Sequence, residues 1–113
     1  MWLIVQQPQP DDYVLATGET HTVREFVELA FKEVGRTVVL KGKGLEEKGM
    51  DQRSGEVLVE IDARYFRPLE VDLLLGDPSK AREKLGWRHR TSFADLIGKM
   101  ARADLDAYKR NLL

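Results

Sequence analysis

The chain has no cysteine among its 113 residues. This absence excludes disulfide bonds, zinc–thiolate sites and thiol catalysis, and it fits a reducing compartment. The chain also lacks an excess of charge of one sign, since 18 basic side chains stand against 19 acidic ones. Nucleic-acid-binding proteins usually carry a strong basic excess, so that class is not favoured.

Histidine is scarce, and long hydrophobic runs are missing. His21 and His89 are the only histidines and have no ligand spacing, so no metal site is expected, and both are predicted on the surface or near a helix cap. The apolar run at residues 1–5 turns polar at Gln6, which is too short for a signal peptide core or for the roughly 20 residues of a membrane span. We therefore expect a cytoplasmic protein that forms a single domain over residues 1–113.

The sequence offers no catalytic group. A nicotinamide enzyme of the short-chain type needs a tyrosine with a lysine four residues later, because the lysine lowers the tyrosine pKa. The residues found at that spacing after the three tyrosines are Thr17, Leu69 and Leu112. The glycines around Lys43 do not have the spacing of a dinucleotide fingerprint and predict an exposed loop. Ser54 and Ser79 have no adjacent base, so we expect no catalytic residue in the chain.

Three helices are predicted, together with the end of a fourth at the start of the chain. Thr22 and Glu25 have capping-box spacing before an apolar face with helical period, and Gly35 follows as a stop, which predicts a helix over residues 23–34. Asp77 and Gly86 bound a shorter helix, and residues 1–7 resemble the end of another. A final helix opens at Ser92 and Asp95, with an expected core side of Phe93, Leu96, Ile97, Met100, Ala101, Leu105 and Tyr108.

Short strands are predicted at residues 13–16, 37–40, 57–61 and 73–75, with residues 41–56 as an exposed excursion. The fold class is therefore a small mixed α/β unit. Strands this short favour part of a larger fold, and the apolar side chains of Trp2, Leu3 and Val5 need a partner surface.

Arg67 and Glu70 flank a proline, and they are the candidate binding residues. A residue before proline is held extended, so Arg67 is presented outward. Its guanidinium matches phosphate oxygens, and a carboxylate such as Glu70 can accept hydrogen bonds from both hydroxyls of a ribose. The alternative is a surface ion pair, which stabilises a fold by at most about 1 kcal/mol.

Four stretches carry a family resemblance. They are Met-Trp-Leu at residues 1–3, residues 12–26 with Ala-Thr-Gly-Glu-Thr-His, Tyr-Phe-Arg-Pro-Leu-Glu-Val-Asp at 65–72, and residues 76–87 with Gly-Asp-Pro-Ser-Lys-Ala and Leu-Gly-Trp. The chain resembles the C-terminal part of the GDP-mannose 4,6-dehydratase family, within the extended short-chain dehydrogenases that act on sugar nucleotides. The similarity covers nearly the whole chain, although Leu69 stands where the family leads us to expect threonine.

The resemblance implies a fold and an activity. It implies a substrate-binding domain that closes over GDP-mannose, with an N-terminal Rossmann domain that binds NADP and holds the catalytic residues. The family converts GDP-mannose to GDP-4-dehydro-6-deoxymannose, a precursor of GDP-fucose, and the parent is expected to be a homo-oligomer. Arg67 would then bind the diphosphate and Glu70 the ribose hydroxyls.

The family's glycine-rich loop and catalytic set are absent from this sequence. We therefore expect an inert fragment that binds no NADP by itself, with Met1 as an internal methionine of the parent. Two alternatives stay open, namely the same region of another sugar-nucleotide epimerase or reductase, and a small non-enzymatic α/β module that acts by association.

Overall fold

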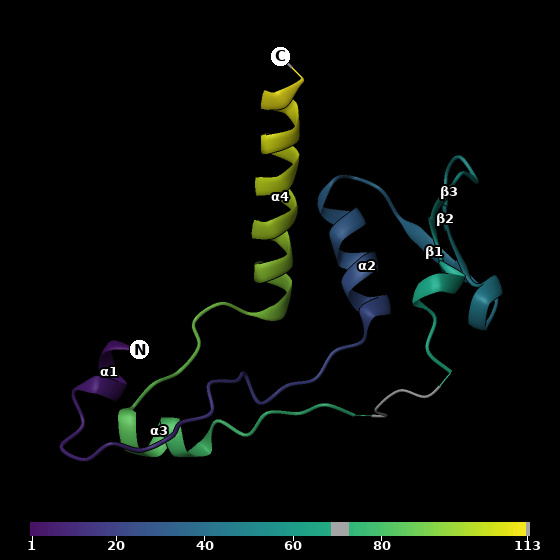
Figure 1. The fold of residues 1–113 in the computed structure, drawn as a ribbon. Coiled ribbons are helices and arrows are strands. Elements are labelled where there is room, and N and C mark those ends of the chain that lie inside the picture. The colour runs from purple at the N-terminus through teal and green to yellow at the C-terminus, as the bar shows by residue number, and fades with distance from the viewer. Residues whose placement is uncertain (69–72, 113) are drawn as a thin grey trace. The chain divides into compact units, whose positions relative to one another are not determined.

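The computed structural model describes residues 1–68 and 73–112, which divide between two compact units (Figure 1). The first unit joins Met1–Thr20 with Val71–Ser92 and contains helices α1 (Trp2–Val5) and α3 (Ser79–Leu85). The second joins His21–Glu70 with Phe93–Leu113. It contains α2 (Val23–Glu33), β1 (Val38–Lys41), η1 (Gly44–Glu46), β2 (Lys48–Asp51), β3 (Val57–Glu60), η2 (Ala63–Tyr65) and α4 (Phe93–Asn111). The mixed α/β class is confirmed, and each unit is described by itself below.

Helix α2 begins and ends as its sequence predicts. The Thr22 hydroxyl accepts a hydrogen bond from the Glu25 amide at 3.1 Å, and the Glu25 carboxylate accepts one from the Thr22 amide at 3.0 Å. At the other end Gly35 has a φ of +81°, and the Arg36 amide donates back to the Phe31 carbonyl at 2.9 Å. This is the Schellman arrangement, in which a left-handed glycine satisfies the last carbonyls of a helix.

The sheet of the second unit is antiparallel, in the order β1-β2-β3. The predicted strands at 37–40 and 57–61 are confirmed to within a residue. The exposed excursion predicted for residues 41–56 is confirmed for 41–46 and 52–56, which are exposed, but it is wrong for β2, which forms the middle strand. The segment Lys-Gly-Met-Asp has little strand propensity of its own, so hydrogen bonds to two neighbours decide its conformation.

The middle strand of that sheet needs a glycine at position 49. Gly49 pairs with Leu40 on one side and Val59 on the other. A Cβ at this position would lie 2.9 Å from a methyl carbon of Val38 and 3.2 Å from side-chain atoms of Leu40 and Val59. The missing side chain therefore lets the apolar side chains of the outer strands close over the middle strand.

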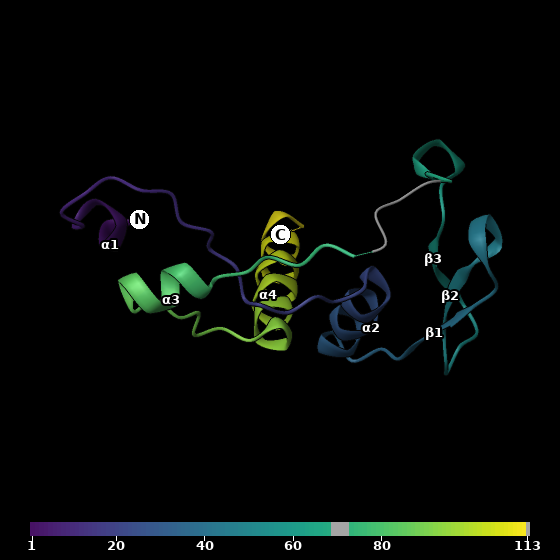
Figure 2. The same ribbon diagram turned by 90° about the horizontal axis from the view of Figure 1, so that it is seen from below.

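Helix α2 packs against both β1 and α4, and Figure 2 shows it between α4 and the sheet. Ile97 of α4 is 1% exposed, and burial of such a side chain contributes roughly 1.5–3 kcal/mol. Gly98 is also buried, close to the Glu33 carboxylate, and Glu33 pairs with Arg102 at 3.0 Å. The predicted core side of α4 is wrong for Leu96, Met100 and Tyr108, which are 49%, 46% and 63% exposed. Only one stripe of the helix meets α2, because a single neighbouring helix covers less than its whole apolar face.

The first unit is held together by polar contacts between α3 and the N-terminal segment. The Arg82 guanidinium donates to the Thr17 carbonyl at 3.1 Å, and Lys80 pairs with Asp11 at 2.8 Å. Ala81 is fully buried, and Gly86 ends the helix with a φ of +65°. The helix begins at Ser79 and Pro78 is its N-cap, yet the Asp77 carboxylate accepts from the Ser79 amide at 3.0 Å, so Asp77 satisfies one of the first amides as expected.

The strands predicted at 13–16 and 73–75 are wrong. Neither segment has regular secondary structure, and Leu73, Leu74 and Leu75 are 61%, 76% and 57% exposed. Residues 13–16 pass close to Gly76. A Cβ at Gly76 would lie only 2.6 Å from the Ala16 Cβ, so this position has no room for a side chain. An apolar run indicates a preference for burial, but a strand also needs a hydrogen-bonded neighbour, and none is found for these segments in the described part of the chain.

Replacement of Thr22 tests the hydrogen bond that caps the start of α2. Thr22→Ala should lower the free energy of unfolding by about 1 kcal/mol, because the Glu25 amide loses its acceptor. Urea unfolding followed by circular dichroism measures the change. Thr20→Ala, which removes another exposed threonine hydroxyl, should change the stability by much less; equal losses in the two variants would contradict this role of Thr22.

Asp51 links the sheet to the end of α2 and makes stability depend on pH. Its carboxylate is buried, accepts from the Arg53 amide at 2.8 Å and pairs with Arg36 at 3.0 Å. The pKa of Asp51 lies below its ordinary value of 3.8. The largest cause is the hydrogen bond from the Arg53 backbone amide, and the Ser54 backbone amide and the positive charge of Arg36 lower the pKa further. The stabilisation is therefore fully present above pH 3.8 and is lost as the pH falls through the lower folded-state pKa.

Asp51→Asn should consequently be less stable than the unchanged chain at pH 7, and the difference should shrink as the pH falls below 3.8. Urea unfolding at a series of pH values measures both. Asp104→Asn, on the exposed side of α4, controls for the loss of one negative charge. A difference for Asp51→Asn that stays constant down to pH 2 would rule out this linkage.

Candidate functional site

The candidate binding residue Arg67 lies in the connection that follows η2. Phe66 ends η2 in an extended conformation, with φ −70° and ψ 127°, and Pro68 follows Arg67 at a bend. Arg67 is exposed, as the extended position before a proline predicts. Glu70, its predicted partner in ligand binding, lies outside the described residues.

An Asx-type turn fixes the start of this connection. The Asp62 carboxylate accepts from the Arg64 backbone amide at 2.9 Å and from its guanidinium at 2.8 Å. The hydrogen bonds from the Arg64 side chain, and next its backbone amide, hold the pKa of Asp62 below its ordinary value. Asp62 is therefore ionised at neutral pH and offsets the charge of Arg64.

Sequence reasoning missed the surroundings of Arg67. The Arg64 guanidinium lies 5.5 Å from the centre of the Tyr65 ring, and that ring is 77% exposed. An exposed aromatic side chain beside a guanidinium group is suited to contact a planar or anionic ligand. The spacing of Asp62 and Arg64 was the available signal, because aspartate commonly accepts from the amide two residues later.

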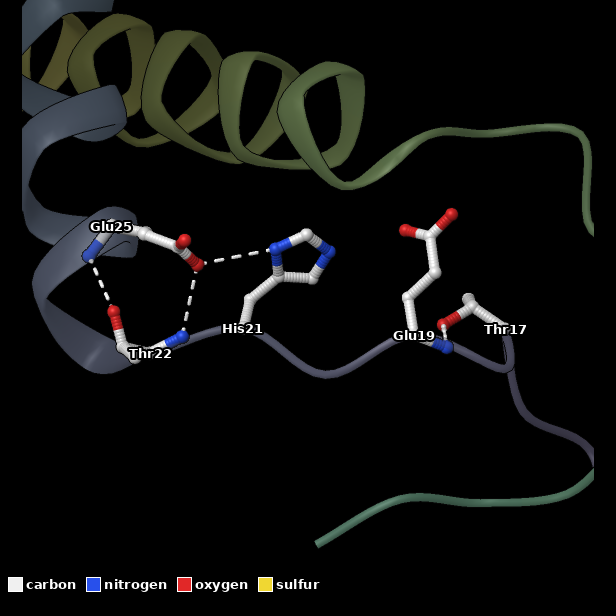
Figure 3. A network of polar contacts seen from close by, with 5 residues as sticks. All are labelled: Thr17, Glu19, His21, Thr22 and Glu25. Atoms are coloured by element: carbon white, nitrogen blue, oxygen red, sulfur yellow. Dashed lines mark hydrogen bonds and ion pairs between the residues drawn. The ribbon is translucent and has the colours of Figure 1, made fainter. Parts of the chain in front are cut away.

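His21 belongs to a polar network at the start of α2, where its sequence position predicted a capping-region residue. Its Nδ1 lies 3.2 Å from the same Glu25 carboxylate oxygen that accepts from the Thr22 amide, and Figure 3 shows these three side chains together. The ring stacks on Phe93, with centroids 3.9 Å apart and planes at 1°. The network thus ties the first turn of α2 to the first turn of α4. Close to it in sequence, the Thr17 hydroxyl accepts from the Glu19 amide at 3.4 Å.

The other sequence candidates have structural roles. Gly42 and Gly44 have φ values of +94° and +58° and lead into η1, not into an α-helix that could receive a phosphate. A Cβ at Gly42 would lie 2.8 Å from the Glu46 carbonyl oxygen, which explains the glycine. Residues 1–68 and 73–112 contain no cluster of three or more histidine or acidic side chains suited to a metal ion. Within the same residues, no helix is long and apolar enough to cross a membrane.

Comparison with known proteins places the chain in a family. Residues 1–100 match the family model described as GDP-mannose 4,6 dehydratase. The chain is 58% identical to a GDP-mannose 4,6-dehydratase of Sinorhizobium fredii over 93% of its own length and 30% of the relative's. It is 50% identical to the GDP-mannose 4,6 dehydratase of Drosophila melanogaster over 98% of its length and 28% of the relative's. The human GDP-mannose 4,6 dehydratase is 46% identical over 98% of the chain and 30% of the relative. The chain therefore spans about 30% of the length of these curated relatives.

Proposed function

The chain belongs to the GDP-mannose 4,6-dehydratase family, and from this we propose that it is the C-terminal, substrate-binding part of such an enzyme. The parent would convert GDP-mannose to GDP-4-dehydro-6-deoxymannose. Within this part, Arg67 would bind the diphosphate and Glu70 the ribose hydroxyls. The exposed position of Arg67, between the extended Phe66 and Pro68 and inside the matched residues 1–100, is the observation that carries the proposal.

The chemistry of Arg67 suits a diphosphate. A guanidinium donates several coplanar hydrogen bonds to phosphate oxygens and stays charged at every physiological pH. Each charge-assisted hydrogen bond contributes roughly 1.5–3 kcal/mol. The neighbouring Arg64 guanidinium pairs with the Asp62 carboxylate at 2.8 Å, so we assign the diphosphate to Arg67 and not to Arg64.

The described residues do not fit NADP, the cofactor that the family implies. A dinucleotide site needs a parallel βαβ unit with a glycine-rich turn leading into an α-helix. Here the sheet is antiparallel, and the glycines around Lys43 lead into a single 3-10 turn. We therefore propose that NADP and the groups that carry out the reaction belong to other parts of the parent, and that this part binds and orients the sugar nucleotide.

The first unit has an exposed apolar surface, which favours the proposal that another domain of the parent packs against it. Trp2 and Val5 of α1 are each 71% exposed, and Leu73 to Leu75 are all more than half exposed. Exposed apolar patches of this kind mark surfaces that pack against another protein surface. In the parent we propose that the Rossmann domain covers them; homo-oligomer formation and a cytoplasmic location stay predictions from the sequence.

A nucleotide titration tests the proposed site. Arg67→Ala should weaken binding of both GDP and 2′,3′-dideoxy-GDP by about tenfold or more, because each ligand keeps the diphosphate. Glu70→Ala should weaken GDP alone, because only GDP has the ribose diol. NMR chemical-shift titration of the chain measures the affinities, and Arg53→Ala, which removes another exposed arginine, is the control. The assignment fails if Arg67→Ala and Glu70→Ala both bind GDP as the unchanged chain does.

The partner surface has its own test. The chain by itself should self-associate through its exposed apolar side chains, and Trp2→Asp should reduce that association by placing a charge in the patch. Light scattering over a range of concentrations measures the mass. Tyr108→Asp, at an exposed aromatic position of α4, is the matched control and should have a smaller effect. A chain that stays monomeric at high concentration would argue against the patch.

A further inference from the structure

A short basic segment follows α3 in the first unit. Arg88, His89 and Arg90 are consecutive and come directly after Trp87. The chain as a whole has a net charge of −1, so this segment is a local concentration of positive charge. The connection that carries Arg67 belongs to the second unit.

The three basic side chains have no acidic partner within residues 1–68 and 73–112. The ion pairs recorded nearby involve the lysines of α3 with Asp11, and none includes Arg88, His89 or Arg90. The positive charges of Arg88 and Arg90 repel one another, and no carboxylate of the described residues pairs with either. A bound anion would remove this unfavourable term.

The basic segment also lines a concave surface. A pocket of about 500 Å³ is formed by Leu3 of α1 together with residues 86–91. This volume lies within the range of small-molecule sites, which commonly combine an apolar wall with a few polar groups. Leu3 and the half-buried Trp87 are the large apolar residues of its lining, and Arg88, His89 and Arg90 are the basic ones.

Exposure alternates along the segment. Trp87 and His89 are half-buried, whereas Arg88 and Arg90 are exposed. Such alternation is typical of an extended chain, in which residues two apart point to the same side with Cα atoms roughly 7 Å apart. Two guanidinium groups at that separation can reach the oxygens of one phosphate or of two linked phosphates.

The base of the segment is held in place by α3. Gly86 adopts a left-handed conformation that turns the chain out of the helix, and the Trp87 amide then donates to the Ala81 carbonyl at 3.3 Å. Ala81 is fully buried, so the anchor lies on the best-packed residue of this unit. The backbone entropy of ordering the start of the segment is therefore lost on folding, not on ligand binding.

From these observations we propose that Arg88, His89 and Arg90, with Trp87 and Leu3 as the apolar wall, form a binding site for a phosphate-bearing small molecule. The site prefers a diphosphate to a single phosphate, because two guanidinium groups then contact two charged groups. None of its residues belongs to the substrate site proposed at Arg67. A free diphosphate and the diphosphate of a nucleotide share this chemistry, and the test separates them.

Pyrophosphate binding, followed by tryptophan fluorescence, tests the proposal. In the Trp2→Phe variant, Trp87 is the only tryptophan and reports directly on the pocket. We expect a saturable change with pyrophosphate, at constant ionic strength, and a weaker response to inorganic phosphate. Arg88→Gln with Arg90→Gln should reduce the affinity for pyrophosphate about tenfold or more. The double replacement Arg53→Gln with Lys109→Gln removes the same charge from exposed positions elsewhere and should change it by less than about twofold.

A second measurement needs no arginine variant. The two histidines give separate NMR signals, and pyrophosphate should shift the ring signals of His89 while those of His21 stay in place.

Titration with GDP in the Arg67→Ala background shows whether a nucleotide diphosphate also occupies the pocket. The proposal is overturned if no saturable change occurs up to about 10 mM pyrophosphate, if the control pair loses as much affinity as the arginine pair, or if both histidines shift equally. Because Arg67 is replaced in the last titration, loss of the proposed substrate site leaves this outcome unaffected.

Discussion

Helix α2 has to begin at Val23, and most of the second unit depends on that start. The Thr22 and Glu25 pair satisfies two backbone amides that have no partner inside the helix, and Glu25 also meets His21. With its start fixed, α2 presents one apolar side to β1 and another to α4. The stack of His21 on Phe93 then joins the starts of the two helices. One local hydrogen-bond arrangement thus sets the relation of three elements.

The opposite end of α2 is tied to the sheet by charge. Arg36, directly after the terminating glycine, pairs with Asp51 at the end of β2. Asp51 is buried, and a buried carboxylate is tolerated only where hydrogen bonds and an opposite charge satisfy it. The Arg53 amide and the Arg36 guanidinium meet that requirement, and in doing so they fix the turn between β2 and β3. Residues 62–67, which carry the candidate site, follow β3 and so depend on this sheet for their position in the second unit.

The first unit is limited by the small size of its buried core. Its buried core in the described residues is small and centres on Ala81, while leucines and a tryptophan remain exposed. Hydrophobic burial is the main favourable term in folding, so a unit with this much exposed apolar surface gains stability from any surface that covers it. The same unit carries a cationic segment whose arginines pair with no carboxylate among residues 1–68 and 73–112. Both features give the unit surfaces for partners, one apolar and one charged.

Local signals in the sequence determined the helices and their ends, because capping boxes, left-handed glycines and helical periodicity act over a few residues. They also determined the exposed position of Arg67, through the restriction that proline imposes on the residue before it. Family membership was likewise readable from the motifs at residues 12–26, 65–72 and 76–87. The strands at 38–41 and 57–60 were also predicted from the sequence, but only the tertiary structure decided which segments pair. Strand β2 forms with a polar sequence, whereas the apolar residues 13–16 and 73–75 pair with no strand in the described part of the chain. A strand exists through hydrogen bonds to a neighbour distant in sequence, and no local pattern records whether that neighbour is present.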